Sequence, residues 1–207
     1  VKADDDDNKP FDDEDRFDEN ALWYEANGYD CYYFGDGDDG AMRTGKTTIN
    51  YDGENTSFYF EKSGGKKGAG VTGEKDDKLY QSGMLLKADS DDKYIVVDKA
   101  TKTVNGKTVV TYDKLDDAKD SMDQDNVVAT NLLENTTADT RVNIGNNSNK
   151  KAEDLTEAYK ISFTQSDEDV KHEYVLVNTS GKVIDSKGKN KDGNDYYYVT
   201  DSKGVIT

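Results

Sequence analysis

Residues whose types and spacing could carry out chemistry are few in this chain of 207 residues. It contains one cysteine, Cys31, and one histidine, His172, so a Cys/His catalytic pair would have to join these two. Nothing in the sequence around either residue supports that pair. A lone Cys forms no internal disulfide, and a lone His forms no His-rich zinc site. The 44 acidic residues allow so many carboxylate pairs that the sequence favours none of them for hydrolysis.

One stretch has the spacing of a phosphate-binding loop. The residues GAMRTGKT at 40–47 satisfy the pattern G-x-x-x-x-G-K-[ST]. A phosphate loop follows a buried parallel strand and opens a helix, whereas here an aromatic hairpin cluster precedes the pattern and the strand-like TTINYDG follows it. The acidic DGDDG at 36–40 lacks the spacing of an EF-hand and indicates a hairpin turn. We therefore predict no catalytic residue, no metal site and no cofactor, and hence a protein that is not an enzyme.

Short clusters of aromatic and β-branched residues dominate residues 21–113. They are separated by Asn-Gly, Asp-Gly, Gly-Gly and Asp-Asp, which is typical of strands joined by tight turns. The clearest hairpin is VNGKTVVTY at 104–112, where Asn105 and Gly106 suit a type I′ turn because both central residues need positive φ. Pro10 is the only proline, which suits a chain made mostly of paired strands.

Residues 114–172 have a different pattern, and we predict an irregular insertion with short helices. The segments at 114–125 and 150–160 space their apolar residues three or four apart. One strand is expected at Val142–Ile144, and YKISFTQ at 159–165 alternates apolar and polar residues like the start of another.

The first 20 residues hold ten acidic residues, mostly in two blocks. Such blocks repel themselves and are normally solvated, so residues 1–20 are predicted to be an acidic leader or linker. Weak binding of divalent cations is the alternative.

An aromatic–turn–glycine pattern recurs along the chain. The aromatic triplet at 32–34 lies six to eight residues before Gly40, and the triplet at 196–198 lies at the same distances before Gly204. A third copy, YVLVNTSGKVI at 174–184, aligns without a gap with the C-terminal YYVTDSKGVIT. The alignment matches the two glycines and the apolar residues that follow them.

A looser fourth copy links the first of these units to the next cluster. GAMRTG at 40–45 matches GAGVTG at 68–73, which is preceded by FYF at 58–60. A single two-stranded hairpin is marginal in water, and stacking similar units covers the apolar face of each. We therefore predict a mainly β fold in which the hairpins of 21–113 and 173–207 stack as a solenoid.

The net charge of −17 and the pI of about 4.4 argue against two classes of partner. Nucleic acid requires a basic stripe, which the sequence lacks, and an anionic membrane surface would repel the chain. No stretch of 18 apolar residues is present, so we expect no membrane insertion. The 14 tyrosines supply bulk that can be buried while each hydroxyl stays in water.

Trp23, Asn27 and Gly28, followed by YYF at 32–34 and GAMRTG at 40–45, closely resemble the cell-wall-binding repeats of Gram-positive surface proteins. These are repeats of the choline-binding and glucan-binding type, in which the aromatic triplet, the turn, GAM and TG occur in a fixed order.

The resemblance is strong over about 21–46, looser to about 98 and faint over 173–207, and it does not include 114–172. It implies stacked β-hairpins and an extracellular protein, either at the cell surface or secreted. It also implies binding of teichoic-acid choline or of glucan. In such repeats aromatic faces hold the choline ammonium by cation–π attraction. The ligand-binding residues that the resemblance implies are Trp23, Tyr24, Tyr32 and Tyr33.

Departures from the family pattern leave alternatives open. Lys46 and Glu74 stand where the family has the Trp of TGW, and Cys31 stands where it has the Trp of WYY. Lys46 would place a like charge beside any bound ammonium. The aromatic residues could instead form the core between repeats or stack on sugar rings. The leading prediction is a non-enzymatic module that binds cell-wall or envelope polysaccharide. The alternatives are a structural stalk or adhesion scaffold without a ligand, and an accessory module of a cell-wall-active enzyme.

Overall fold

The computed structural model is mainly β, with almost no helix. It describes residues 24–35, 40–51, 53–115, 127–144, 148–163, 169–191 and 197–206. The predicted acidic leader at 1–20 and the candidate residue Trp23 lie outside these ranges. All strand pairings among the described residues are antiparallel, as expected for a chain built from hairpins.

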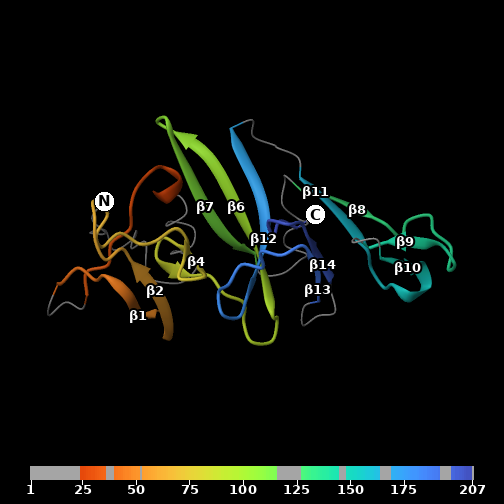
Figure 1. The fold of residues 1–207 in the computed structure, drawn as a ribbon, viewed down its shortest axis with the longest axis horizontal. Helices are drawn as coiled ribbons and strands as arrows, with labels where there is room; N and C mark the ends of the chain where they lie inside the picture. Colours follow the sequence, from red (N-terminus) through yellow and green to blue (C-terminus); the bar gives the residue numbers. More distant parts are fainter. Residues whose placement is uncertain are drawn as a thin grey trace.

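The strands of the described residues form five small sheets rather than one continuous sheet (Figure 1). A five-stranded sheet has the order β1-β2-β5-β4-β3 and a three-stranded sheet the order β12-β6-β7, and β8 with β11, β9 with β10 and β13 with β14 form pairs. The strand bounds are β1 Gly45–Tyr51, β2 Glu54–Phe60, β3 Gly73–Lys75, β4 Lys78–Gln81, β5 Met84–Leu85, β6 Tyr94–Val104, β7 Lys107–Leu115, β8 Val127–Asn131, β9 Arg141–Asn143, β10 Asn149–Lys151, β11 Tyr159–Phe163, β12 Val170–Asn178, β13 Gly188–Lys191 and β14 Tyr197–Thr200.

The hairpin predicted at Asn105-Gly106 is confirmed. β6 and β7 are joined by these two residues, with Val104 opposite Lys107, and their φ values are 51° and 77°. Positive φ at both central residues is the mark of the type I′ turn, whose twist matches that of the flanking strands.

Five glycine-containing turns share one pairing pattern. In each, a residue shortly before the turn pairs with the residue two positions after a glycine, and that glycine has a φ between 51° and 97°. We name the segments hairpin 1 (32–42), hairpin 2 (58–70), hairpin 3 (78–85), hairpin 4 (175–183) and hairpin 5 (198–206). Their pairs are Phe34 with Met42, Phe60 with Gly70, Tyr80 with Leu85, Val177 with Val183, and Thr200 with Ile206.

Each hairpin also pairs with the next one in the series through a backbone hydrogen bond or a β-bridge. Between hairpins 2 and 3 the bond runs from the Tyr59 N–H to the Gly83 carbonyl, and between hairpins 3 and 4 from the Leu79 N–H to the Gly181 carbonyl, both at 2.8 Å. Hairpin 1 meets hairpin 2 through the antiparallel bridge of Tyr32 with Ala69, and hairpin 4 meets hairpin 5 through that of Val175 with Val205. Hairpin 3 thus contacts hairpin 4 although the chain between them forms β6 to β11.

In each of hairpins 2 to 5, the first strand pairs with the strand that lies before it in the same sheet. β1 pairs with β2, β3 with β4, β6 with β12, and β13 with β14. We call the residue that pairs across the turn, such as Phe60, the closing residue of its hairpin. On the neighbouring strand the closing residues lie opposite Gly45 for Phe60, Gly73 for Tyr80, Ile95 for Val177 and Gly188 for Thr200. The predicted match of GAMRTG with GAGVTG is therefore reproduced in the pairing, because both end at this position.

Hairpins 4 and 5 are also equivalent in their side-chain contacts. The Asn178 side-chain oxygen accepts hydrogen bonds from the N–H groups of Ser180 and Lys182, and the Asp201 carboxylate accepts them from Lys203 and Val205. These Asx-type contacts replace backbone partners within a tight turn. The predicted alignment of Gly181 with Gly204 is confirmed.

The hydrophobic core consists mainly of side chains from consecutive hairpins and from β6. Its largest cluster joins residues from hairpins 2, 3 and 4 with β6, and a second cluster joins β6, β7 and β12 with hairpin 5. The most deeply buried of these side chains are Phe60, Leu79, Tyr174, Val97, Leu176 and Val177.

The helix predicted over 150–160 is wrong. The described part of this segment contains a single short 3-10 turn, η1 Ala152–Asp154, after which Leu155 is extended and β11 begins at Tyr159. An isolated helix of this length is marginal, and strand pairing of β10 with β9 and of β11 with β8 replaces it. The strands expected at Val142–Ile144 and at 159–165 are present as β9 and β11.

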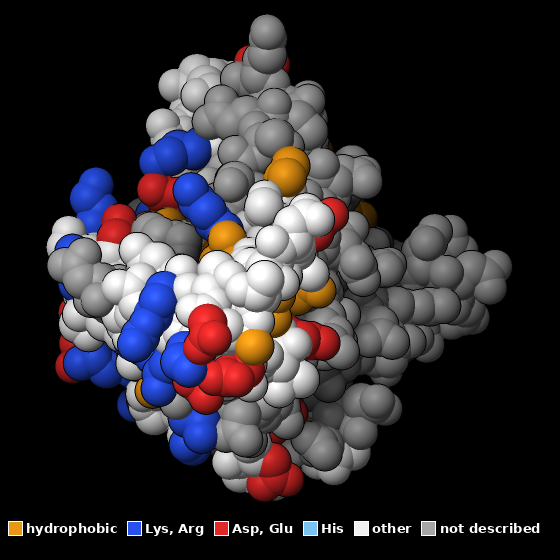
Figure 2. Space-filling view, turned by 90° about the vertical axis from the view of Figure 1, so that its right-hand side faces the viewer, with side chains coloured by type: hydrophobic (Ala, Val, Ile, Leu, Met, Phe, Trp, Pro, Cys, Tyr) orange, Lys and Arg blue, Asp and Glu red, His pale blue; other side chains and the backbone are white. Residues whose placement is uncertain are grey.

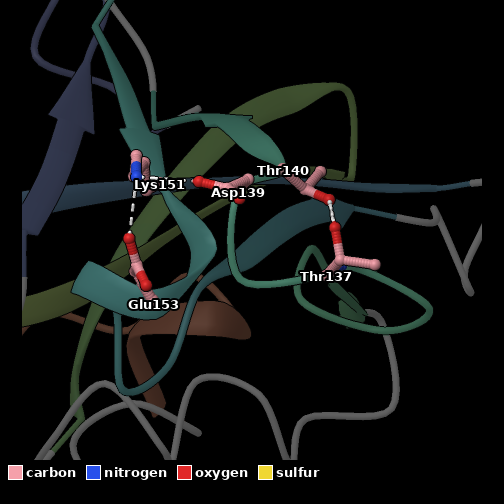
Figure 3. Close-up of polar contacts among 5 residues, drawn as sticks. All are labelled: Thr137, Asp139, Thr140, Lys151 and Glu153. Atoms are coloured by element: carbon pink, nitrogen blue, oxygen red, sulfur yellow. Dashed lines mark hydrogen bonds and ion pairs between the residues drawn. The ribbon is translucent and has the colours of Figure 1, made fainter.

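Charged contacts fix the same segment. Lys151 donates to Asp139 at 2.8 Å and to Glu153 at 2.9 Å, so one ammonium joins the chain before β9 to η1 (Figure 3). The helix predicted over 114–125 lies mostly outside the described residues. Only its first two positions are described, and they belong to the end of strand β7 at Leu115.

Candidate functional site

The sequence-predicted ligand residues that the structure describes do not all lie on one surface. Tyr24 lies in a helical turn, and its ring meets that of Tyr29 edge to face at 5.7 Å. Tyr33 stacks on Phe60 with ring centroids 6.2 Å apart, at the border of the largest core cluster. Tyr32, by contrast, is 40% exposed.

Tyr32 and Tyr33 cannot line one cage together. They are neighbours in an extended segment, where successive side chains point to opposite faces. Tyr33 faces the core, which agrees with the alternative prediction that these rings form the core between repeats. Tyr32 instead shares its face with Phe34, two residues along, which the sequence analysis did not select. Period-two spacing within YYF was the signal that could have identified Phe34.

Hairpin 1 therefore carries an exposed aromatic edge, which we define as Tyr32, Phe34 and Met42. Their exposed fractions are 40%, 57% and 37%, and Phe34 lies directly opposite Met42. Large apolar side chains that gather on a surface usually mark a site of binding. At the equivalent positions of the other hairpins the apolar side chains are buried: Phe58, Phe60, Tyr80, Val175, Val177 and Tyr198.

A buried polar network lies beneath hairpin 3. The Ser82 hydroxyl donates to the Glu25 carboxylate at 2.7 Å, and the Gln81 amide donates to the Ser82 hydroxyl at 2.9 Å. The Gln81 carbonyl oxygen accepts from the Tyr112 N–H at 2.7 Å. Burial raises the pKa of Glu25 in spite of its hydrogen bonds to Ser82 and Thr72. The network ties the segment before hairpin 1 to hairpin 3 and to β7.

The two residues that could have acted as nucleophiles here are not arranged for it. Burial, with a smaller effect from the charge of Glu25, raises the pKa of the Cys31 thiol to about 11, so the reactive thiolate is scarce at neutral pH. Ser82 is 1% exposed and its hydroxyl is directed at Glu25, so no substrate reaches it.

His172 pairs with an acid rather than with Cys31. Its Nδ1 lies 2.8 Å from the Asp98 carboxylate, on adjacent strands of the central sheet. Burial raises the pKa of Asp98, and the hydrogen bond and charge of His172 oppose that rise. The contact joins strands β6 and β12, and no Cys or Ser of the described residues makes a hydrogen bond with either side chain.

Three further expectations can be compared with the described residues. The GAMRTGKT segment leads into strand β1 and not into a helix, so the strand expected after this pattern is confirmed. The described part of the chain contains no cluster of His, Cys, Asp or Glu suited to a metal, and none of its helices is long and apolar enough to cross a membrane. The DGDDG segment lies mostly outside the described residues.

The end of the molecule that carries β8 to β11 also exposes two large apolar side chains, Val128 on β8 at 47% and Tyr159 on β11 at 42%. The view of this end in Figure 2 shows Lys, Arg, Asp and Glu side chains with hydrophobic side chains between them. Hairpin 1 holds three of the six large apolar side chains that are exposed among the described residues, so its aromatic edge is the strongest candidate site.

Comparison with family models, curated proteins and solved structures finds no match for this chain. The resemblance to cell-wall-binding repeats therefore stays a prediction from the sequence.

Proposed function

We propose that this chain is a non-enzymatic module of stacked β-hairpin repeats that binds a bacterial envelope polysaccharide. It would belong to a surface or secreted protein. The observation that carries the proposal is the exposed aromatic edge of hairpin 1, because the aromatic side chains at the equivalent positions of the other hairpins are buried.

Stacking in series is supported by the shared pairing pattern of hairpins 1 to 5. A lone hairpin leaves an apolar face uncovered, and it is marginally stable at best. Here each hairpin makes a backbone hydrogen bond or a β-bridge with the next, and Tyr33 of hairpin 1 covers Phe60 of hairpin 2. This is the nearest-neighbour arrangement by which repeat proteins stabilise units too small to fold alone.

Sugar binding is supported by the geometry of the aromatic edge. The rings of Tyr32 and Phe34 are two residues apart in an extended segment, which places them about 7 Å apart along one face. An aromatic face can bury the apolar side of a sugar ring, and the tyrosine hydroxyl can remain hydrogen-bonded. Met42 widens the surface with an adaptable apolar side chain.

A structural stalk is the second candidate, because hairpin 1 lacks one contact that the others have. In hairpins 2 to 5 a preceding strand pairs with the closing residue, whereas Phe34 pairs only with Met42 among the described residues. A further hairpin of the same kind would fit that edge and cover it. In this arrangement the edge would extend a scaffold and bind no ligand.

A cell-wall pull-down distinguishes the two candidates. The binding module is expected to sediment with purified Gram-positive walls, and Phe34→Ala should weaken retention roughly thirtyfold, as for the loss of a central aromatic anchor. The control is Tyr159→Ala, another ring that is 42% exposed but lies on β11. Equal retention of both variants would remove the aromatic edge from the site.

Competitors identify the ligand in the same assay. Release by glucan oligosaccharides supports sugar stacking, whereas release by free choline supports a cation–π site that uses Tyr32. Trp23→Ala tests the part of the predicted cage that precedes the described residues. A wild-type protein that stays in the supernatant supports the stalk.

A further inference from the structure

A second surface of the five-stranded sheet differs in charge from the rest of this acidic chain. β5 is only two residues long, Met84–Leu85, and it separates the longer strands β2 and β4. A hollow of about 190 Å³ lies beside Leu85 of β5. Its lining residues are Lys46, Thr47, Thr48, Ser57, Phe58, Lys78, Tyr80 and Leu85.

The polar side chains of the hollow come together because of the strand register. Thr48 lies opposite Ser57, so the two hydroxyls share a face of the sheet, and Lys46 shares it two residues along. On β4, Lys78 and Tyr80 are also two residues apart and share one face of the strand, and Tyr80 lies opposite Leu85.

The hollow has two ammonium groups and no acid in its described lining. Lys46 is exposed and makes no ion pair with any described residue. Lys78 donates to the Ser180 carbonyl of hairpin 4, and two of its three N–H groups are left for another partner. In a chain with a net charge of −17, this is a local cationic site.

We propose that this hollow binds a phosphodiester group of an anionic polyol polymer of the envelope. The inference rests on the proposed envelope-binding function and names a second contact, separate from the aromatic edge. Lys46 and Lys78 supply the charge, and Thr48 and Ser57 supply hydroxyl donors for the phosphate oxygens.

The donor set favours a phosphodiester over a carboxylate. A carboxylate is best matched by the planar fork of arginine, which makes two parallel hydrogen bonds. Lysine ammonium groups are compact charges with rotatable donors, and they suit the several oxygens of a phosphate. The described lining contains lysines and hydroxyls and no arginine.

The test is calorimetric titration of the whole chain with poly(glycerol phosphate), with polygalacturonate and a neutral glucan as comparison polymers. Poly(glycerol phosphate) should bind most tightly, and its affinity should fall when salt is raised because salt screens exposed charges. Lys46→Gln and Lys78→Gln should each weaken this binding about tenfold, as for the loss of a charged hydrogen bond. The matched control, Lys107→Gln on β7, should leave it unchanged.

Three results would overturn the proposal. They are no binding of poly(glycerol phosphate) by the wild type, equal binding of polygalacturonate, and equal effects of Lys46→Gln and Lys107→Gln. Circular dichroism melts of the lysine variants verify folding.

The Phe34→Ala variant separates this proposal from the proposed function. If Phe34→Ala loses glucan binding but retains poly(glycerol phosphate), both sites stand. If wall retention depends on Lys46 and Lys78 but not on Phe34, the hollow stands and the aromatic edge fails.

Discussion

Hairpin 1 and hairpin 2 have the same backbone pattern and opposite burial. Phe34 pairs with Met42 as Phe60 pairs with Gly70, yet Phe34 is 57% exposed and Phe60 is 1% exposed. Tyr33 of hairpin 1 stacks on Phe60, whereas no described ring stacks on Phe34. This difference indicates that each hairpin's own sequence determines its turn and its pairing. The burial of its side chains depends on the neighbouring hairpin that covers them.

The largest expected effect comes from truncating the two equivalent rings. Phe60→Ala removes a buried ring from the largest core cluster and should cost about 3–5 kcal/mol of the free energy of unfolding. Phe34→Ala should change the stability by no more than about 0.5 kcal/mol, because the ring is at the surface. Urea denaturation followed by tyrosine fluorescence measures both. A large loss for Phe34→Ala would show that its ring is part of the core.

The contact between hairpins 2 and 3 gives the next effect. A Cβ on Gly70 would lie 2.2 Å from the Ser82 carbonyl oxygen, whereas a Cβ on Gly65 has nothing within 4 Å. Gly70→Ala should therefore cost about 2–3 kcal/mol, as overpacking against backbone does, and Gly65→Ala should be near neutral. Denaturation midpoints of the two variants provide the comparison. Equal midpoints would refute close packing of these hairpins.

The smallest expected effect concerns pH and the network beneath hairpin 3. Burial raises the pKa of Glu25 in the folded protein above its ordinary value of 4.5. The folded state then binds more protons than the unfolded state between the two pKa values, so this group makes stability fall as pH rises through that window. Above the folded pKa the loss stays constant.

Glu25→Gln tests this pH dependence directly. The side-chain carbonyl oxygen of the glutamine still accepts from Ser82, but it does not ionise, so the fall in stability just above pH 4.5 should become smaller. Glu74→Gln, at an exposed position of β3, removes the same charge without removing a buried acid. Identical pH profiles for the two variants would mean that Glu25 has no special coupling to folding.

The sequence predicted the hairpins best where a turn has a specific chemical signature. Asn105-Gly106 and the matched glycines of hairpins 4 and 5 were all identified, since few residues adopt positive φ. Hairpin 3 lies within the hairpins predicted over 21–113, but it was not identified as a copy of the repeated pattern. Its turn consists of Ser82 and Gly83 alone, with φ values of 50° and 97°, and serine is an uncommon residue there.

Counting back from glycine also misplaced one strand. By distance from glycine Tyr198 corresponds to Phe34, but by pairing it is Thr200 that closes hairpin 5 as Phe34 closes hairpin 1. The turns differ in length, so the distance to the glycine does not fix the register. Tyr198 instead corresponds to Tyr32, on the same face of the strand.

The candidate site was only partly accessible to sequence reasoning. Trp23, Tyr24, Tyr32 and Tyr33 were selected by residue type, and type does not decide which face of a strand a ring occupies. The hollow at Lys46 and Lys78 depends on the early end of β5 and on contacts between strands remote in sequence, which no local pattern encodes.

Hairpins 3 and 4 touch although Lys78 and Ser180 are 102 positions apart. The intervening chain leaves and returns through β6 and β12, which pair along nine residues. A protease cut at the tip of the β6–β7 hairpin would therefore produce two fragments that stay associated. Separately expressed halves divided at Asn105-Gly106 should reassemble, so the chain could serve as a split reporter whose two pieces recognise each other.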